Sequence, residues 1–412
     1  MFEILQPGRV FYGWWMVLAC LIVAVVSWSL GTFGMSVYIH VLSGQRGFSI
    51  GLISTAVTIS YLVTAACLMS LGSATAQLGP KPVIAAGAVI MAVTVAALGF
   101  CREIWQIFLV FAGMGVGRAC LSSTTISTTL APWFERHQGR AVSIALLGAS
   151  IGGMIGTPLL LGGIALLDVE MAFAIAGLSA IVILAPIVVF VLKRRPADLG
   201  LFPDGETPSA AAAARTEAHW SRKGAMATRQ FYSQFVAFAL AMMVQVGFLS
   251  HHVPMVAPTL GDTGASIAVS SAAVSAFVGR VALARFADRI DLRVTTGGVL
   301  LLAAVSLAYM SLTSTGFGLL TASVLYGLTI GNLTTLSPLI ARREFGAVSF
   351  GAVFGVIASA VAFATAFGPG LYGILRDMSG SYHAPLMIAA FVNLLAAGVI
   401  VWGGRKPMPS PH

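Results

Sequence analysis

Long apolar stretches alternate with short polar ones along almost the whole chain. A helix needs about 20 apolar residues to cross the hydrocarbon core of a bilayer, and most of these stretches reach that length. The predicted spans are 14–37, 50–74, 82–101, 104–130, 140–164, 171–192, 231–253, 266–286, 294–313, 317–340, 348–374 and 384–403. The pattern therefore predicts an all-α membrane protein with twelve transmembrane helices.

One polar stretch is much longer than the others. Residues 193–230 are basic and rich in proline and alanine, and they separate six predicted spans from six. The remaining breaks are short, as connections within a helix bundle are. We therefore expect an N-terminal six-helix bundle over 1–192, a cytoplasmic linker over 193–230 and a C-terminal six-helix bundle over 231–412.

The composition supports a membrane protein and changes the meaning of its charge. Only 9% of the residues are charged and 58% are hydrophobic, whereas a soluble domain carries about a quarter charged residues. A net charge of +9 would suggest nucleic-acid binding in a soluble protein. In a membrane protein, basic residues instead collect in cytoplasmic loops, so no nucleic-acid partner is expected.

The distribution of arginine and lysine predicts the orientation. Eighteen of these residues fall on the side of the termini and the linker, and two lie within spans. Only Arg46, Arg102 and Arg376 fall on the other side. The positive-inside rule then places both termini in the cytoplasm. We expect a multi-pass protein of a bacterial cytoplasmic (inner) membrane, with an uncleaved first helix.

The two halves of the chain resemble each other. The stretch Gly113–Arg118 in the fourth predicted span matches Gly327–Asn332 in the tenth, and Pro158 matches Pro369 at nearly the same offset. Such matches indicate duplication into two pseudo-symmetric bundles. Parallel repeats of this kind place the binding site between the halves, near the bilayer midplane.

Loop motifs give the chain a resemblance to a known family. The stretch Ala284–Arg289, between the eighth and ninth spans, resembles the loop motif of the major facilitator superfamily, with its small residue, aspartate and basic residues. The corresponding loop between the second and third spans is a degenerate copy that carries Ala76 where the family usually has aspartate. The resemblance implies the major facilitator fold, and gating roles for Asp288 and Arg289.

Further motifs resemble the monocarboxylate and oxalate/formate transporter branch of that superfamily. They are Phe11–Trp15, Trp133-Phe134 with the following Gly139–Ala141, Arg195–Gly205, and Gly279-Arg280. The resemblance implies alternating-access transport of small organic anions, by symport with a proton or by exchange for another anion. In the family, the arginine of the eighth helix binds the substrate carboxylate, and the motif places that role on Arg280.

Arg280 is also the main candidate on physical grounds. It lies well inside the eighth predicted span, and ionisable residues at such depth are costly and usually functional. A planar guanidinium donates two parallel hydrogen bonds to a carboxylate. The alternative is a structural arginine that binds backbone carbonyls or Asp288.

Three further side chains complete the predicted substrate site. Arg118 is central in the fourth span, and its counterpart in the repeat, Asn332, is also polar and deep. Arg118 is either a second anion contact or a packing arginine that binds backbone, Ser122 or Ser123. Tyr326 is the aromatic candidate for lining the cavity.

The acidic residues are predicted to lie in loops or at helix ends. Two deep arginines without acidic partners would leave uncompensated positive charge, which is strongly unfavourable. An anionic substrate would neutralise that charge, so the pattern disfavours cationic cargo.

The coupling candidates are histidines, because histidine can titrate near physiological pH. His40 lies near the end of the first span, and His251 lies with His252 near the end of the seventh. The simpler interpretation is that these side chains are interfacial and bind only water and lipid headgroups. Proton symport, exchange and passive facilitation all stay open.

No motif predicts an enzyme, a cofactor or a metal site. Four cysteines occur outside any CxxC spacing and are interpreted as packing residues. The expected partners are a small organic anion, the lipid bilayer and a coupling proton, without an obligate protein partner. Two alternatives remain: a facilitator-type exporter of drugs or neutral solutes, and a non-transporting nutrient sensor on the same scaffold.

Overall fold

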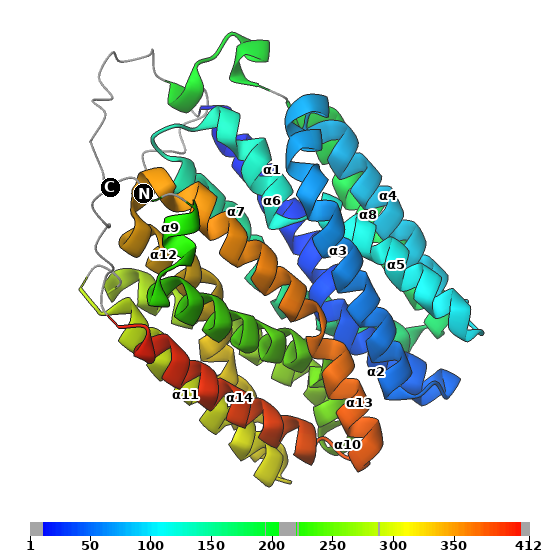
Figure 1. Ribbon diagram of the computed structural model, residues 1–412. Helices are drawn as coiled ribbons and strands as arrows, with labels where there is room; N and C mark the ends of the chain where they lie inside the picture. The colour runs from blue at the N-terminus through cyan, green and yellow to red at the C-terminus, as the bar shows by residue number, and fades with distance from the viewer. Residues whose placement is uncertain (1–10, 194, 206–219, 221, 287–288, 405–412) are drawn as a thin grey trace. The chain divides into compact units, whose positions relative to one another are not determined.

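The computed structural model describes residues 11–193, 195–205, 220, 222–286 and 289–404 (Figure 1). Over these residues the chain forms helices and short connections without a strand, which confirms the predicted all-α fold. Packing divides the chain into two units. Unit 1 comprises Met1–Gly34 and Leu62–Ala213, and unit 2 comprises Met35–Tyr61 and Ala214–His412.

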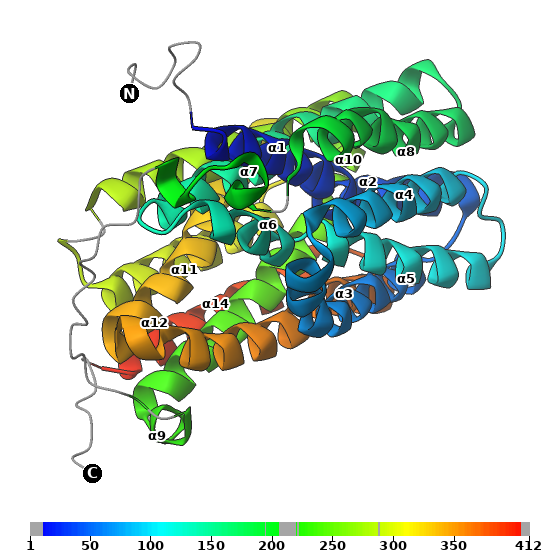
Figure 2. The ribbon, with the colours of Figure 1, turned by 90° about the horizontal axis from the view of Figure 1, so that it is seen from above.

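Unit 1 contains the helices of the first half of the chain except α2 and the beginning of α3. In Figure 2, α4 lies beside α5, and α4 also packs on α8. The elements are α1 (Gly13–Trp28), the π-helix η2 (Ser29–Phe33), α3 beyond Tyr61 (the whole helix is Ile50–Leu78), α4 (Pro80–Leu98), α5 (Ile104–Cys120), α6 (Ser123–Leu130), η3 (Ala131–Trp133), α7 (Gln138–Leu166), α8 (Val169–Pro186), η4 (Ile187–Val191), η5 (Pro196–Leu199) and η6 (Pro203–Gly205).

Unit 2 contains the second half of the chain together with α2 and the beginning of α3. Within it, α11 and α14 run side by side (Figure 1), and α10 packs along α12. The elements are α2 (Gly34–Arg46), α9 (Arg222–Met226), α10 (Arg229–Phe286), α11 (Leu292–Leu312), α12 (Gly316–Ala366), α13 (Gly368–Ser379) and α14 (His383–Trp402).

Eleven helical stretches within the described ranges are long and apolar enough to cross a membrane. One of them, Arg229–Leu283, has 55 residues. At 1.5 Å per residue that is roughly 80 Å of helix, enough for two crossings of a core about 30 Å thick. Its interruption lies at Gly261, where φ is 66° and ψ is 176°. Two crossings in this stretch agree with the twelve predicted spans.

Two predicted connections are almost entirely helical. Residues 254–265 and 341–347 continue the flanking helices, and the chain reverses at single glycines, Gly261 and Gly346. Both have positive φ, and their extended ψ makes a conformation that is essentially restricted to glycine. The predicted boundaries were wrong here because one residue makes each turn, so no run of polar residues marks it.

Glycines bring α7 directly onto α1, as their four-residue spacing suggests for membrane helices. A Cβ atom added at Gly148 would overlap the carbonyl oxygen of Leu21. One added at Gly152 would lie 2.7 Å from the carbonyl oxygen of Val25, and one at Gly156 would lie 2.8 Å from Cα of Ser29. Backbone therefore packs on backbone along this helix pair.

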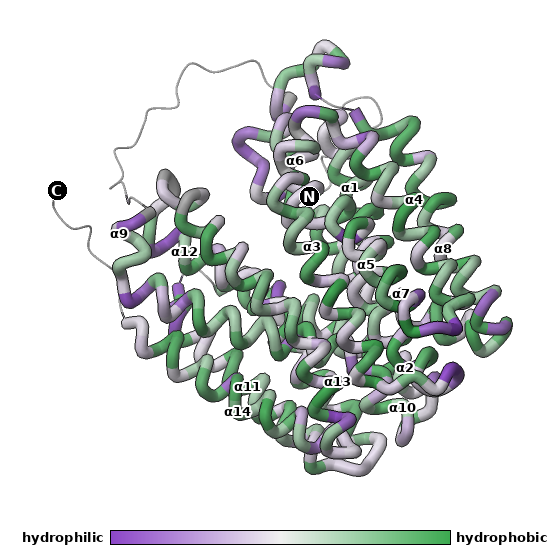
Figure 3. The backbone as a smooth tube through the Cα atoms, turned by 45° about the vertical axis from the view of Figure 1, so that its right-hand side comes forward, coloured by the Kyte–Doolittle hydropathy of each residue, from purple (hydrophilic) through white to green (hydrophobic). Residues whose placement is uncertain are grey.

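Hydrophilic residues gather at the helix ends and connections, whereas the helix bodies are mainly hydrophobic (Figure 3). One ion pair near such helix ends is buried: the side chains of Arg293 and Glu344 are only 6% and 8% exposed. Arg293 donates from Nε at 2.5 Å and from Nη2 at 2.8 Å to the two oxygens of Glu344. The sequence prediction counted Arg293 as a loop charge; it is buried because this bidentate contact satisfies it.

The segment Met35–Tyr61 packs with the second half of the chain. The Val253 amide donates to Oγ of Ser36 at 2.6 Å, and the Gly51 amide donates to the Asp377 carboxylate at 2.8 Å. Both contacts lie within unit 2. The grouping by contacts thus differs from the six-plus-six division by sequence, and that division stays a prediction.

Candidate functional site

Arg280 lies in the last part of α10 and is partly buried. Its Nε donates to the carbonyl oxygen of Gly331 at 3.5 Å, the outer limit for a hydrogen bond. That oxygen also accepts from the hydroxyls of Thr334 and Thr335, each at 3.0 Å. Over the described ranges, Arg280 has no carboxylate within ion-pair distance. Among the described residues, its terminal Nη atoms make no hydrogen bond that would compete with a ligand.

Small residues hold Arg280 against α12. A Cβ atom at Gly279 would lie 2.5 Å from the carbonyl oxygen of Leu328, and one at Gly327 would lie 2.5 Å from that of Ala272. These contacts fix α10 and α12 at backbone distance. The Cβ of Arg280 thereby lies beside Gly331, where an added Cβ would be 3.3 Å away.

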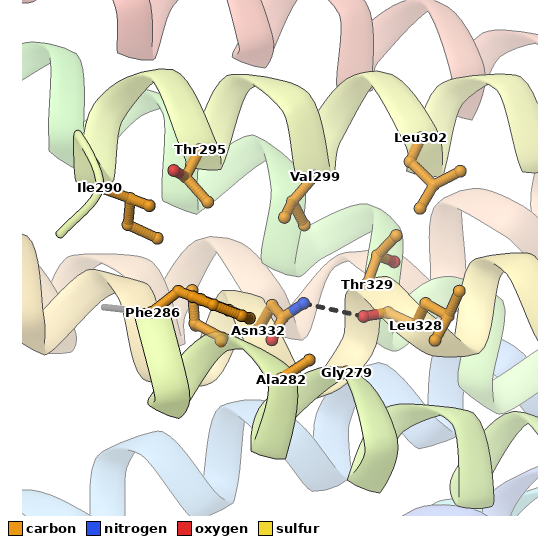
Figure 4. Close-up of a pocket in the computed structure, with 11 residues that line it drawn as sticks. Gly279, Ala282, Phe286, Ile290, Thr295, Val299, Leu302, Leu328, Thr329 and Asn332 are labelled. Atoms are coloured by element: carbon orange, nitrogen blue, oxygen red, sulfur yellow. Dashed lines mark hydrogen bonds between the residues drawn. The ribbon is translucent and has the colours of Figure 1, made fainter. Parts of the chain in front are cut away.

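A cavity of about 400 Å³ lies beside this helix pair (Figure 4). Its walls are mainly apolar. The lining residues are Gly279, Ala282, Leu283, Phe286, Ile290, Thr295, Val299, Leu302, Leu328, Thr329 and Asn332. The α10 members recur at three- and four-residue spacing, so they form one helix face, and Arg280 is not among them.

Asn332 lines this cavity and directly follows Gly331, the residue that Arg280 contacts. Its Nδ2 donates to the carbonyl oxygen of Leu328 at 3.0 Å, as the dashed line in Figure 4 shows. Its Oδ1 is buried without a hydrogen-bond partner among the described residues. Asn332 thus lines this pocket and Arg280 does not, and the joint role of the two residues in substrate binding stays a prediction.

Tyr326 is only 1% exposed. Its ring lies against Phe248, with centroids 4.2 Å apart, and Phe248 also contacts His252 at 4.6 Å. In this structure Tyr326 is therefore a packing residue of unit 2.

Arg118 lies at the end of α5 in unit 1, beside two helix irregularities. The predicted span 104–130 is interrupted there, because α5 ends at Cys120 and α6 begins at Ser123. The Arg118 side chain also packs on Gly31, where an added Cβ would lie 2.8 Å from its Cγ. Gly31 belongs to the π-helix η2, a form that occurs often at functional sites.

Neither irregularity was predicted from the sequence. The signal for the interruption was the Ser122-Ser123 pair within an apolar run: Ser122 caps α6 by accepting from the Thr125 amide at 3.3 Å. Serine commonly begins a helix in this way. The π-turn has no comparable sequence signal beyond the presence of Gly31.

The histidines of α10 are buried, and the expectation of interfacial histidines was wrong for them. His251 and His252 are 0% and 1% exposed. His251 Nε2 lies 3.0 Å from the carbonyl oxygen of Pro369 and 3.1 Å from Oγ of Ser54, and its Nδ1 lies 3.0 Å from the Tyr382 hydroxyl. Residues distant in sequence thus replace the water that was expected.

These partners determine which nitrogen of His251 carries the proton. The Pro369 carbonyl can only accept, so Nε2 must donate. In the neutral ring, Nδ1 then accepts from the Tyr382 hydroxyl. Ser54 donates its own proton to the carbonyl oxygen of Ile50 at 2.6 Å, which leaves its oxygen as a second acceptor for Nε2.

The second coupling candidate, His40, and the gating candidate Arg289 are more exposed than the histidines of α10. His40 binds Asp262 at 2.9 Å, with side-chain exposures of 28% and 54%. Arg289 lies in an exposed turn after α10, where its amide donates to the carbonyl oxygen of Phe286 at 2.9 Å. Asp288 lies outside the described residues. The gating roles of Asp288 and Arg289 therefore stay predictions.

The chain matches the sequence profile of the Major Facilitator Superfamily over residues 17–369. It is also similar to Monocarboxylate transporter 13 of Rattus norvegicus, with 24% identity over 343 residues that cover 80% of this chain and 75% of the relative. The same protein of Bos taurus gives 24% identity over 79% of this chain and 74% of the relative.

Solved structures show the same fold. A bacterial homologue of the human lysosomal transporter Spinster, in an inward-facing and occupied conformation, superposes with a TM-score of 0.73 at 14% identity, covering 97% of this chain and 98% of the other. A mutant of the nucleoside transporter NupG gives 0.72 at 13% identity, covering 95% and 100%. From the helices, the fold and the profile match together, the chain is a multi-pass membrane transporter, not an enzyme, and belongs to the Major Facilitator Superfamily.

Proposed function

We propose that this protein transports small organic anions of the monocarboxylate kind by alternating access. The observation that carries the proposal is Arg280, a partly buried arginine in a spanning helix, which makes a single weak hydrogen bond, through Nε, among the described residues. We further propose that the protein lies in a bacterial inner membrane. The distribution of its basic residues supports an orientation with both termini in the cytoplasm.

The chemistry of the guanidinium favours a carboxylate as the ligand. An unpaired arginine within a membrane protein is costly, and a bound anion offsets that cost. The planar Nη pair fits both oxygens of a carboxylate, which a lysine ammonium cannot do. The similarity to proteins named as monocarboxylate transporters supports this assignment.

In unit 1, Arg118 is the candidate for contact with the anion. It lies beside Gly31 of the π-helix η2 and near the end of α5, so the backbone around it is irregular. In membrane proteins, irregular backbone is tolerated where protein buries it or where it lines a cavity. We assign it a supporting role in anion binding. Its replacement by glutamine should then raise KM for the anion more than it lowers the maximal rate.

Uptake of labelled lactate, pyruvate and oxalate into proteoliposomes tests the role of Arg280. Loss of charge-assisted hydrogen bonds of about 1.5–3 kcal/mol should lower uptake by Arg280→Gln by roughly 10- to 100-fold. Arg280→Lys should retain part of the activity, because it keeps the charge without the bidentate geometry. Arg342→Gln, at an exposed arginine of α12, is the matched control.

Three results would contradict this proposal. If both Arg280 variants transport at the wild-type rate, the arginine does not bind substrate. Transport of a neutral solute that is unaffected by Arg280→Gln would favour a facilitator-type exporter. Binding of carboxylates without flux would favour a nutrient sensor.

For coupling, we propose His251 as the proton-binding residue. Its Ser54 contact joins the segment Met35–Tyr61 to α10, so separation of that segment would expose the ring to water. The charged and titratable groups around it are Tyr372, Tyr382, Asp377 and Arg376. His40, with its exposed Asp262 partner, is the weaker candidate because water already reaches both side chains.

A coupling role makes a specific kinetic prediction. His251→Gln should lose uphill accumulation driven by a pH gradient, since glutamine does not titrate, while anion exchange at equal pH continues. His383→Gln, an exposed histidine bonded to Ser311, serves as the control and should accumulate substrate normally. Uphill accumulation by His251→Gln at the wild-type level would exclude the role.

A further inference from the structure

Sequence stretches far apart in the chain meet at one end of unit 1. Phe11 and Tyr12 lie 6.2 and 5.5 Å from the ring of Trp133, and Trp14 lies 5.2 Å from Phe134. These five residues form an aromatic cluster between the beginning of α1 and the end of the α6–η3 segment. Arg140 lies 5.7 Å over the Trp14 ring and adds the beginning of α7.

A third stretch, residues 195–205, packs on the same end, and we call it the strap. It follows η4 and contains two short 3₁₀ helices, η5 and η6, joined through Gly200, whose φ is 68°. Within the strap, Asp198 accepts from the Arg195 amide at 3.0 Å. The second 3₁₀ turn, η6, contacts both α1 and η3. The strap thus connects the end of α8 and η4 to the beginning of α1.

The central residue of the strap is Asp204. Its Oδ2 accepts from the amides of Glu135 and Arg136 at 2.9 and 2.8 Å, and its Oδ1 accepts from the His137 amide at 3.4 Å and lies 3.2 Å from His137 Nδ1. The side chain is only 8% exposed. Three successive amides therefore converge on one carboxylate.

Those amides lie in the bend directly before α7, the 29-residue helix that packs on α1. The N-cap residue of α7, His137, makes no side-chain capping bond of its own. The first amides of a helix have no partner within it and carry the positive end of the helix dipole. From a remote part of the chain, Asp204 supplies an acceptor to the N-cap amide of His137 and to the two amides before it.

The backbone conformation of Asp204 also indicates that its carboxylate is held in a specific position. Its φ is 56°, the only positive φ of a non-glycine residue over the described ranges. Aspartate and asparagine tolerate this conformation better than other side chains. The conformation turns the strap so that the carboxylate faces residues 135–137.

The Asp204 carboxylate is held in its charged form. Burial alone would disfavour the charge, but the amides of Arg136 and Glu135 and the His137 side chain outweigh it and lower the pKa below the ordinary 3.8. Because the folded-state pKa is lowered, the contact contributes fully above pH 3.8 and is lost only as the pH falls through the lowered value. The strap is therefore closed throughout the physiological range.

We propose that Asp204 is a positioning residue, and that the strap permanently ties the beginnings of α1 and α7 to the end of η4. One further bond supports such a tie: the Tyr12 hydroxyl donates to the carbonyl oxygen of Val191 at 2.8 Å. Lys81, at the beginning of α4, donates from Nζ to the carbonyl oxygen of Val189 at 3.1 Å and so joins α4 to η4 as well. This end of unit 1 then moves as one rigid piece during transport. The proposal rests on transport as such and is independent of the substrate's charge.

Point variants test the charge of Asp204 separately from its backbone. Asparagine keeps the positive φ and one acceptor oxygen but replaces the other oxygen with an NH2 group, which only donates; glycine keeps the φ without any acceptor. Both variants should lower the maximal transport rate by about tenfold, with KM nearly unchanged, because the substrate site is elsewhere. Asp198→Asn, in the same strap but without a contact to α7, should transport like the wild type.

A covalent replacement of the contact distinguishes a permanent tie from a gate that opens. Asp204→Cys with Arg136→Cys is made in a protein whose four native cysteines are replaced, and a short thiol-specific crosslinker joins the pair. We expect low transport before crosslinking and recovery toward the wild-type rate after it. Loss of transport on crosslinking would overturn the proposal, because it would show that the strap must detach.

The folded state is checked independently. If Asp204→Asn elutes as aggregate, the crosslinked pair still tests the tie, since crosslinking should restore a monodisperse protein. Wild-type transport by both Asp204→Asn and Asp204→Gly would show that the carboxylate has no positioning role. Wild-type transport by both Asp204 variants with an impaired Arg280→Gln would refute the strap alone and leave the proposed function intact.

Discussion

At the scale of single residues, buried polar groups in this protein depend on partners from distant parts of the chain. Arg293 and Glu344 exchange two charge-assisted hydrogen bonds, and Arg293 also donates to Ser233 and to the carbonyl oxygen of Ile400. Removing one member of a buried pair leaves an uncompensated charge, which typically costs more than the pair contributes.

Glu344→Gln should therefore destabilise the protein by about 3–5 kcal/mol, measured by thermal unfolding in detergent. The apolar double variant Arg293→Met/Glu344→Leu should be closer to the wild type, because it leaves no unpaired charge. An unchanged unfolding temperature for Glu344→Gln would mean that water reaches Arg293.

At this scale, the sequence predicted some buried polar residues and not others. A charge in an apolar run is visible locally, so Arg280 and Arg118 were identified as deep cations. The burial of His251 was not predicted, because Ser54 and Tyr382, its partners, are distant in sequence. The strap contact of Asp204 is invisible in the sequence for the same reason.

At the scale of elements, glycine spacing determines which helices approach closely. Gly148, Gly152 and Gly156 recur every fourth residue of α7 and face the α1 backbone, whereas Gly162 of the same helix has no atom within 4 Å of an added Cβ. Gly162 falls outside the four-residue register, so the spacing and the packing agree.

Gly148→Val should consequently destabilise unit 1 by at least 1–3 kcal/mol through overpacking, because the added atoms overlap the carbonyl oxygen of Leu21. Gly162→Val is the control in the same helix and should unfold near the wild-type temperature. Similar unfolding temperatures for the two variants would show that α1 and α7 separate easily.

Helix existence was easier to predict than helix continuity. Lipid imposes a minimum length on every span, and this strong constraint made the spans recognisable. Interruptions depend on one or two residues: Gly261 and Gly346 make turns without polar runs, and Ser122 begins α6 inside a predicted span.

At the scale of the whole molecule, hydropathy and motifs predicted the superfamily, and the profile match confirmed it. The orientation, the division into two six-helix bundles and the anion specificity stay predictions. Specificity depends on which side chains share a cavity. Asn332 illustrates the difficulty, because repeat symmetry paired it with Arg118 but the structure places it in the apolar pocket of α10, α11 and α12.

The strap also has a consequence for biosynthesis. The ribosome completes α7 before it makes α8, and it makes Asp204 later still. Until Asp204 has emerged, the amides of residues 135–137 lack their carboxylate acceptor, and a nascent unit 1 is held mainly by its helix contacts. Synthesis of the strap therefore completes the contacts of unit 1. We expect chains truncated just before Asp204 to be degraded faster than chains truncated just after Gly205.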